Sequence, residues 1–94
     1  MKMNNMPFEF QNKLRLIIIT ALLSGDKSFN ELKIITQATD GNLSSKLKSL
    51  EETKFITITK SYQQNKPNTI CKLTDYGKGL FIDYVRELEK YIKK

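Results

Sequence analysis

The spacing of apolar residues changes twice along this chain of 94 residues, and that change limits the folds it can adopt. Up to about Thr53 the apolar residues recur at the three- and four-residue spacing of helices. Over residues 55–62 they alternate with polar and β-branched residues, as in a strand. From residue 75 the helical spacing returns. The sequence therefore predicts one domain over residues 1–94, mainly α with a β-hairpin (α+β), in the order α-α-α-β-β-α.

The first predicted helix covers residues 8–23 and begins near Phe8 or Gln11. Leu14, Ile17 and Ile18 lie at helical spacing, and further apolar residues extend the stripe around most of the circumference. A helix of this kind is expected to be buried on more than one side.

The second predicted helix covers residues 29–36. Ser28 and Glu31 have the spacing of a capping box, in which each residue binds the backbone N–H of the other. Leu32 and Ile35 are expected to face the core. The helix is short, and only about three residues separate it from the next one, which is the length of the turn in a helix-turn-helix.

The third predicted helix covers residues 40–53, with Thr39 as its N-cap. Leu43, Leu47 and Leu50 form a narrow apolar stripe, and the remaining surface is small or polar. Such a helix can dock on the domain through one face and offer hydrogen-bonding groups to the major groove through the other. The alternative is the solvated face of an ordinary amphipathic helix. The candidate DNA-binding residues here are Thr39, Asn42, Ser44, Ser45, Lys46 and Lys48.

A hairpin is predicted over residues 55–73, with a polar turn around Pro67. In a winged helix, Lys66 at such a turn would approach phosphate, and Asn65 or Asn68 would approach the minor groove. The alternative is an exposed turn without a binding role. In the second strand, Cys71 alternates with Leu73 and is expected to be a small core residue rather than a redox sensor.

The last predicted helix covers residues 75–94 and has a wide apolar stripe. This stripe and the aromatic residues before the first helix predict a two-fold dimer interface. The alternative is that all of these side chains pack within one chain. The candidate interface residues are Phe8, Phe10, Leu80, Phe81, Tyr84, Leu88, Tyr91 and Ile92.

The charge balance favours an acidic partner. Sixteen Lys and Arg against ten Asp and Glu give a net charge of +6, which points to nucleic acid first and an anionic membrane second. Between Gly41 and Ile70 there are five lysines and two glutamates, which gives this segment a net charge of +3. The positive charge is therefore concentrated on the predicted third helix and hairpin.

The absence of histidine and the single cysteine exclude several kinds of chemistry. An intramolecular disulfide, a His/Cys metal site and a catalytic imidazole cannot form. We expect no cofactor, no metal and no enzymatic activity. No segment is apolar over the length of a membrane span, and the N-terminus lacks the apolar core of a signal peptide. A cytoplasmic protein is expected.

The sequence resembles small single-domain winged helix-turn-helix regulators of the MarR/ArsR-like group over nearly the whole chain after Asn12. Three runs carry the resemblance: SFNEL at residues 28–32, TDGNLSSKLKSLEE at residues 39–52 and KPNTICKLTDYG at residues 66–77. The chain departs from the family pattern in two ways. Lys46 replaces the usual histidine, and one or two arginines of the family's wing are replaced, which leaves Lys66 and Asn68.

The resemblance implies a homodimer on a pseudo-palindromic DNA site. The third helix would lie in the major groove, and the first and last helices would form the dimer interface. The sequence hypothesis is thus a sequence-specific transcriptional regulator that binds double-stranded DNA. The alternative is a winged helix that binds another protein and not DNA. A small-molecule effector could lie between the dimer helices, but no residue indicates one.

Overall fold

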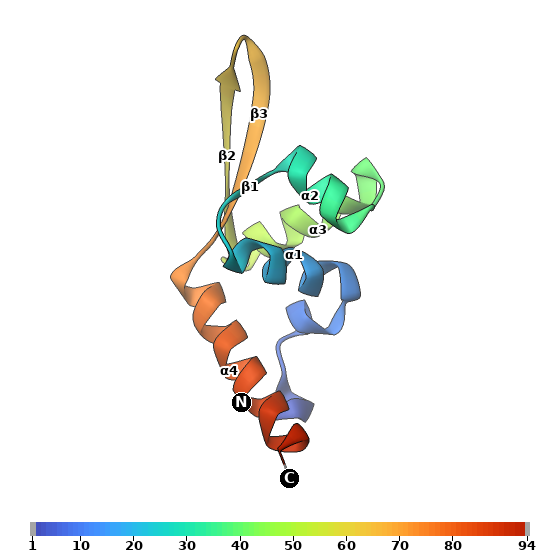
Figure 1. Cartoon of the computed structure of the whole chain (residues 1–94), viewed down its shortest axis with the longest axis vertical. Helices are drawn as coiled ribbons and strands as arrows, with labels where there is room; N and C mark the ends of the chain where they lie inside the picture. The colour runs from blue at the N-terminus through green and yellow to red at the C-terminus, as the bar shows by residue number, and fades with distance from the viewer. Residues whose placement is uncertain (1, 94) are drawn as a thin grey trace.

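The computed structural model describes residues 2–93 and has the predicted order of three helices, a hairpin and a last helix (Figure 1). Met1 and Lys94, the ends of the predicted domain, lie outside the described residues. The hairpin projects from the helices along the longest axis of the molecule, which measures 53 × 25 × 22 Å. The elements are the 3-10 turns η1 (Met3–Asn5) and η2 (Phe8–Gln11), then α1 (Lys13–Leu23), β1 (Lys27–Ser28), α2 (Phe29–Thr36), α3 (Asp40–Glu52), β2 (Ile56–Gln63), β3 (Lys66–Leu73) and α4 (Asp75–Ile92).

The first helix begins later than the sequence predicted. Asn12 is its N-cap, and the Asn12 side chain accepts a hydrogen bond of 2.9 Å from the N–H of Arg15. Residues 8–11 form the separate turn η2 before it. An Asn side chain that takes up a free N–H of the first turn favours a helix start at that position, so the prediction of a helix from Phe8 or Gln11 is wrong.

The second helix has the predicted bounds and the predicted capping box. Glu31 donates its N–H to the Ser28 hydroxyl at 3.0 Å, and its carboxylate accepts the Ser28 N–H at 2.9 Å. This backbone hydrogen bond lowers the pKa of Glu31. Leu32 is fully buried, but Ile35 is 47% exposed, against the prediction. Phe29, Leu32 and Thr36 form the inward stripe, which leaves Ile35 at its edge.

The sheet has three strands rather than the two predicted, in the order β1-β3-β2. The two residues of β1 pair with Cys71 and Ile70 of β3. The hairpin turn is also tighter than predicted. Gln63 pairs directly with Lys66, and the turn consists of Gln64 and Asn65 with φ of 52° and 62°. Positive φ at both central residues is the geometry of a two-residue hairpin turn that follows the twist of its strands.

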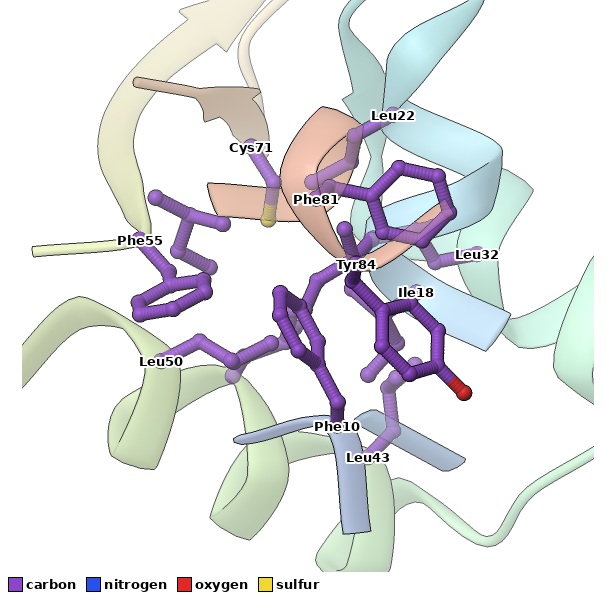
Figure 2. Close-up of a cluster of buried hydrophobic side chains, with 13 residues drawn as sticks. Phe10, Ile18, Leu22, Leu32, Leu43, Leu50, Phe55, Cys71, Phe81 and Tyr84 are labelled. Carbon is purple, nitrogen blue, oxygen red and sulfur yellow. The ribbon is translucent and has the colours of Figure 1, made fainter. Parts of the chain in front are cut away.

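Phe10 occupies the centre of the core, where η2, α4 and the start of β2 meet (Figure 2). Its ring lies 4.8 Å from that of Tyr84, 5.6 Å from Phe55 and 5.9 Å from Phe81, measured between centroids. Phe10, Phe81 and Tyr84 are all buried within one chain. Their predicted place on a dimer surface is therefore corrected: the turn η2 brings Phe10 inward, and α4 packs on it through Phe81 and Tyr84.

The junction between α3, β2 and α4 is held by the backbone of Phe55. Thr74 caps α4 by accepting the N–H of Gly77 at 3.0 Å, and its own N–H donates to the carbonyl of Phe55 at 2.9 Å. Its hydroxyl lies 2.6 Å from the carbonyl oxygen of Lys54, to which it can donate. A Cβ at Gly77 would lie 2.6 Å from the carbonyl oxygen of Phe55. Only glycine allows α4 to start this close to β2.

Replacement of this glycine is expected to destabilise the fold. Gly77→Ala should lower the free energy of unfolding by about 1–3 kcal/mol, because the new methyl group meets backbone that cannot move freely. Gly79→Ala is the matched control in the same helix, since nothing lies within 4 Å of its Cβ position. It should raise the stability by up to about 1 kcal/mol. Urea unfolding of both variants followed by circular dichroism measures the difference, and equal stabilities would contradict the close approach.

Candidate nucleic-acid interface

The third helix is held to the domain by one narrow apolar stripe, as predicted. Leu43, Leu47 and Leu50 are buried in the core, and the other residues of α3 are exposed or half-buried. A helix docked through three leucines leaves most of its circumference free to meet a partner. The candidate residues Ser44, Ser45 and Lys48 all lie on this free surface.

The start of α3 is fixed by its turn and by α2. Gln37 adopts the left-handed conformation with φ of 55° and ends α2. The Thr39 hydroxyl accepts the N–H of Asn42 at 3.2 Å, which confirms Thr39 as the N-cap. Lys33 of α2 forms an ion pair with Asp40 in the first turn of α3. These contacts hold the two helices of the helix-turn-helix in one orientation.

The candidate residues of α3 divide between two flanks of the helix. Ser44 and Lys48 lie on the flank beside the hairpin, where they line a groove. Asn42 lies on the opposite flank, beside the start of α1, and lines a second hollow with Asn12. At about 100° per residue, Lys46 lies on the same flank as Asn42, and it is half-buried. Ser45 points away from the leucine stripe between the two flanks.

The groove beside the hairpin has a volume of about 720 Å³ and lies between α3 and the strands β2 and β3, with Phe29 of α2 also in its lining. Lys60 and Thr69 of the hairpin face Ser44, Lys48 and Glu51 of α3 across it. The sequence analysis did not identify Lys60 or Thr69 as site residues. The alternation of β2 could have done so, because Lys60 follows the inward-facing Ile58 by two residues.

The two residues predicted for the wing, Lys66 and Asn68, lie on the other face of the hairpin. Lys66 pairs with Gln63, and Asn68 pairs with Ser61. These pairs belong to the face of the hairpin opposite to the pair Ile58–Cys71, whose side chains point to the core. The structure therefore separates Lys66 and Asn68 from the groove that Ser44 and Lys48 line.

The lysines of this region are not neutralised within residues 2–93. The ion pairs in that part of the chain involve Lys33, Lys90 and Lys93, and none involves a lysine of the hairpin or the exposed part of α3. Their charge is therefore available to an external anion. In the same range, no group of three acidic or Cys side chains is placed to hold a metal ion. None of the helices there combines the length and the apolar character that a membrane span needs.

A family model described as a winged helix DNA-binding domain matches residues 14–92 of the chain. The uncharacterized protein MJ0432 of Methanocaldococcus jannaschii is 39% identical over 79 residues, which cover 82% of this chain and 86% of that protein. The family model leaves only residues 1–13 and the last two outside it.

Two solved structures have the same fold. One is the transcriptional regulator homologue protein from Pyrococcus horikoshii OT3, with 25% identity and a TM-score of 0.84 over 92% of this chain and 86% of that one. The other, from Enterococcus faecalis V583, is described as a transcriptional regulator of the MarR family, with 21% identity and a TM-score of 0.79 over 96% of this chain and 81% of that one. The matches confirm the predicted resemblance to winged-helix regulators: the family model describes a DNA-binding domain, and both structures are described as transcriptional regulators rather than enzymes.

Cys71 is a core residue, as the sequence analysis expected. It is fully buried in β3 beside the hydrophobic core (Figure 2). Burial raises the pKa of the Cys71 thiol to about 11, and the carboxylate of Glu51 adds to the effect. Since the thiolate is the reactive species, the fold keeps this cysteine inert in two ways, by exclusion of reagents and by suppression of ionisation.

The native protein should therefore resist thiol reagents. At pH 8, a pKa of about 11 lowers the thiolate fraction by about 100-fold relative to a thiol at the ordinary value of 9.0. We expect the reaction of native Cys71 with a chromogenic disulfide reagent to be at least about 100-fold slower than that of the urea-unfolded chain. Equal rates in the two states would show that Cys71 is accessible and contradict its structural role.

Proposed function

Because the chain belongs to the family of winged helix DNA-binding domains, we propose that it regulates transcription by binding a specific sequence of double-stranded DNA. The free surface of α3 is the observation that carries this proposal. It presents hydroxyl, amide and ammonium groups on a helix whose buried side chains are the three leucines of one narrow stripe. A major groove about 12 Å wide admits such a helix, and these groups match the hydrogen-bonding edges of bases and phosphates.

Each candidate residue of α3 has a role that follows from its position. Ser45 points most directly away from the domain and suits a base edge. Ser44 and Lys48, on the hairpin flank, suit phosphate or guanine. Asn42, on the α1 flank near the start of the helix, has an amide that can pair with adenine. Lys46 is half-buried on that same flank and suits a phosphate at the edge of the groove.

We also propose that the protein acts as a homodimer. The 3-10 turns and the end of α4 lie at the end of the molecule opposite to the hairpin tip (Figure 1). Phe8 is half exposed there and Ile92 is 78% exposed, although both are large apolar side chains. Leu80, Leu88 and Tyr91 of the predicted interface are also at least partly exposed. A second copy that covers this surface would create a two-fold symmetric protein, which suits half-sites about 34–36 Å apart on a pseudo-palindromic operator.

Charge reversal on α3 tests the DNA-binding surface. Ser45→Glu combined with Lys48→Glu should weaken binding to a duplex selected with the wild-type protein by at least about 100-fold, because two carboxylates would face bases and phosphates. Fluorescence anisotropy measures the affinity, and sedimentation of the complex should show two chains per duplex. Binding by the wild type should fall by about 10³–10⁵ between 50 and 200 mM salt if the dimer touches some 6–10 phosphates.

The matched control is Lys78→Glu combined with Gly79→Glu, on exposed positions of α4. This variant changes the net charge by the same amount but leaves α3 intact, so it should retain most of the affinity. Equal losses in the two double variants would contradict the assignment of α3 as the recognition helix. A wild-type protein that retains no duplex in the selection would contradict DNA binding altogether.

Gly41 provides an independent test, because the fold does not require it. Nothing lies within 4 Å of its Cβ position, and it is exposed in the first turn of α3. A glycine inside a helix costs up to about 1 kcal/mol relative to alanine. Close approach of the helix backbone to DNA would explain why a glycine is nevertheless present there.

Gly41→Ala should therefore change stability and binding in opposite directions. We expect a gain of up to about 1 kcal/mol in the free energy of unfolding and a loss of about tenfold in DNA affinity. Gly79→Ala, whose Cβ position is equally open, should give the same gain with unchanged affinity. Urea unfolding and anisotropy on the same preparations measure both quantities. Wild-type affinity in Gly41→Ala would contradict the close approach.

A further inference from the structure

We propose that the sugar–phosphate backbone of one DNA strand lies in the groove between α3 and the hairpin, where Lys60 and Tyr62 make the contacts of the wing. Lys66 and Asn68, which the sequence pattern favoured, would play no part in that contact. The inference rests on the proposed DNA binding and adds the residues and the face of the hairpin that hold the DNA.

The register of the hairpin determines which side chains lie on its inner face. Residues directly opposite each other in an antiparallel pair share a face, and the faces alternate along each strand. Ile58 pairs with Cys71 on the face that covers the core, and the next pair on that face is Lys60 with Thr69. The pair after it is Tyr62 with Pro67. The inner face of the hairpin, defined by these pairs, changes from apolar at its base to cationic and aromatic towards its tip.

The groove brings side chains of the hairpin and of α3 together. Lys60 and Thr69 line it from the hairpin, and Ser44 and Lys48 line it from α3. Two ammonium groups and two hydroxyl groups thus line one space, together with the apolar side chains of Phe29, Leu47 and Ile58. Lysines, serines and threonines are among the side chains that bind phosphate oxygens in protein–DNA complexes. The groove is continuous with the exposed face of α3, so a strand whose bases meet α3 can pass its backbone through it.

The position of Glu51 shows which end of the groove is acidic and which end is basic. Glu51 lines the same space, and its charge acts on the thiol of Cys71, at the base of the hairpin. Lys48 precedes Glu51 by three residues, about 4.5 Å along the helix axis, and Lys60 lies two residues beyond Ile58 towards the tip of the hairpin. The acidic group is therefore at the end near the core, and the two lysines are farther out. A phosphate is expected beside Lys48 and Lys60 and not at the base.

Tyr62 extends this surface beyond Lys60. It is 77% exposed, and within residues 2–93 it has no contact with another aromatic ring and no side-chain hydrogen bond. Two residues of strand advance it by about 6.5–7 Å towards the tip, a length comparable with the spacing of successive phosphates. Its ring can pack on a deoxyribose while its hydroxyl donates to the next phosphate.

A pair of lysine variants in the same hairpin tests the proposal. Lys60→Ala and Lys66→Ala remove the same charge from exposed positions on opposite faces, so they share any long-range electrostatic effect. We expect Lys60→Ala to lower the affinity for the selected duplex by about tenfold. It should also reduce the slope of log affinity against log salt by about 0.9 for each lost phosphate contact, or about 2 in a dimer. Lys66→Ala should change the affinity less than about twofold, and Tyr62→Ala should weaken binding without a change of slope.

The outcomes separate this proposal from the proposed function. If the wild type binds the duplex and the α3 double variant does not, while Lys60→Ala and Lys66→Ala behave alike, the groove is wrong and DNA binding stands. A larger loss in Lys66→Ala than in Lys60→Ala would likewise overturn the assignment of the inner face. If the wild type does not bind DNA, both proposals fail. Thermal unfolding of each variant checks that the fold is unchanged.

Discussion

The carbonyl group of Phe55 is the point where α3, the hairpin and α4 meet. The N–H of Thr74 donates a hydrogen bond to it, and α4 can begin beside it because Gly77 has no side chain. The N–H of Phe55 in turn binds the carbonyl of Leu50 near the end of α3. Because one residue joins all three elements, the angle between α3 and the hairpin is not free to vary. The groove between them, and with it the spacing of Lys48 and Lys60, depends on this contact.

The features that were predicted correctly from the sequence are those with local causes. Ser28, Thr39 and Thr74 cap helices through bonds to residues three positions away, and such bonds are visible in sequence spacing. The two residues of β1 were missed because their partners, Cys71 and Ile70, lie more than forty positions along the chain. Phe10 was predicted to lie on a dimer surface because spacing shows that a side chain is apolar, but not whether its own chain or a second copy covers it.

In the candidate site too, the features with local causes were predicted and those that depend on distant parts of the chain were not. The periodicity of α3 was sufficient to predict which of its residues lie opposite the leucine stripe, since 100° per residue is a property of any helix. The two flanks of the helix look equivalent in sequence. Only the packed hairpin distinguishes the flank of Ser44 from that of Asn42, and only the register of β3 against β2 shows that Lys66 lies on the other face of the hairpin from Lys60.

The separation between the leucine stripe and the polar surface of α3 also separates stability from recognition. Within the part of the chain that the structure describes, Ser44, Ser45 and Lys48 make no side-chain hydrogen bond or ion pair, so their replacement leaves the packing intact and changes only the surface proposed to meet DNA. Thr39 differs, because its hydroxyl already caps α3, and loss of a cap costs about 1 kcal/mol. A weaker affinity in a Thr39 variant would therefore mix a misplaced helix with a lost contact. Variants of Ser44, Ser45 and Lys48 avoid this ambiguity, because these side chains are exposed and neither cap the helix nor pack in the core.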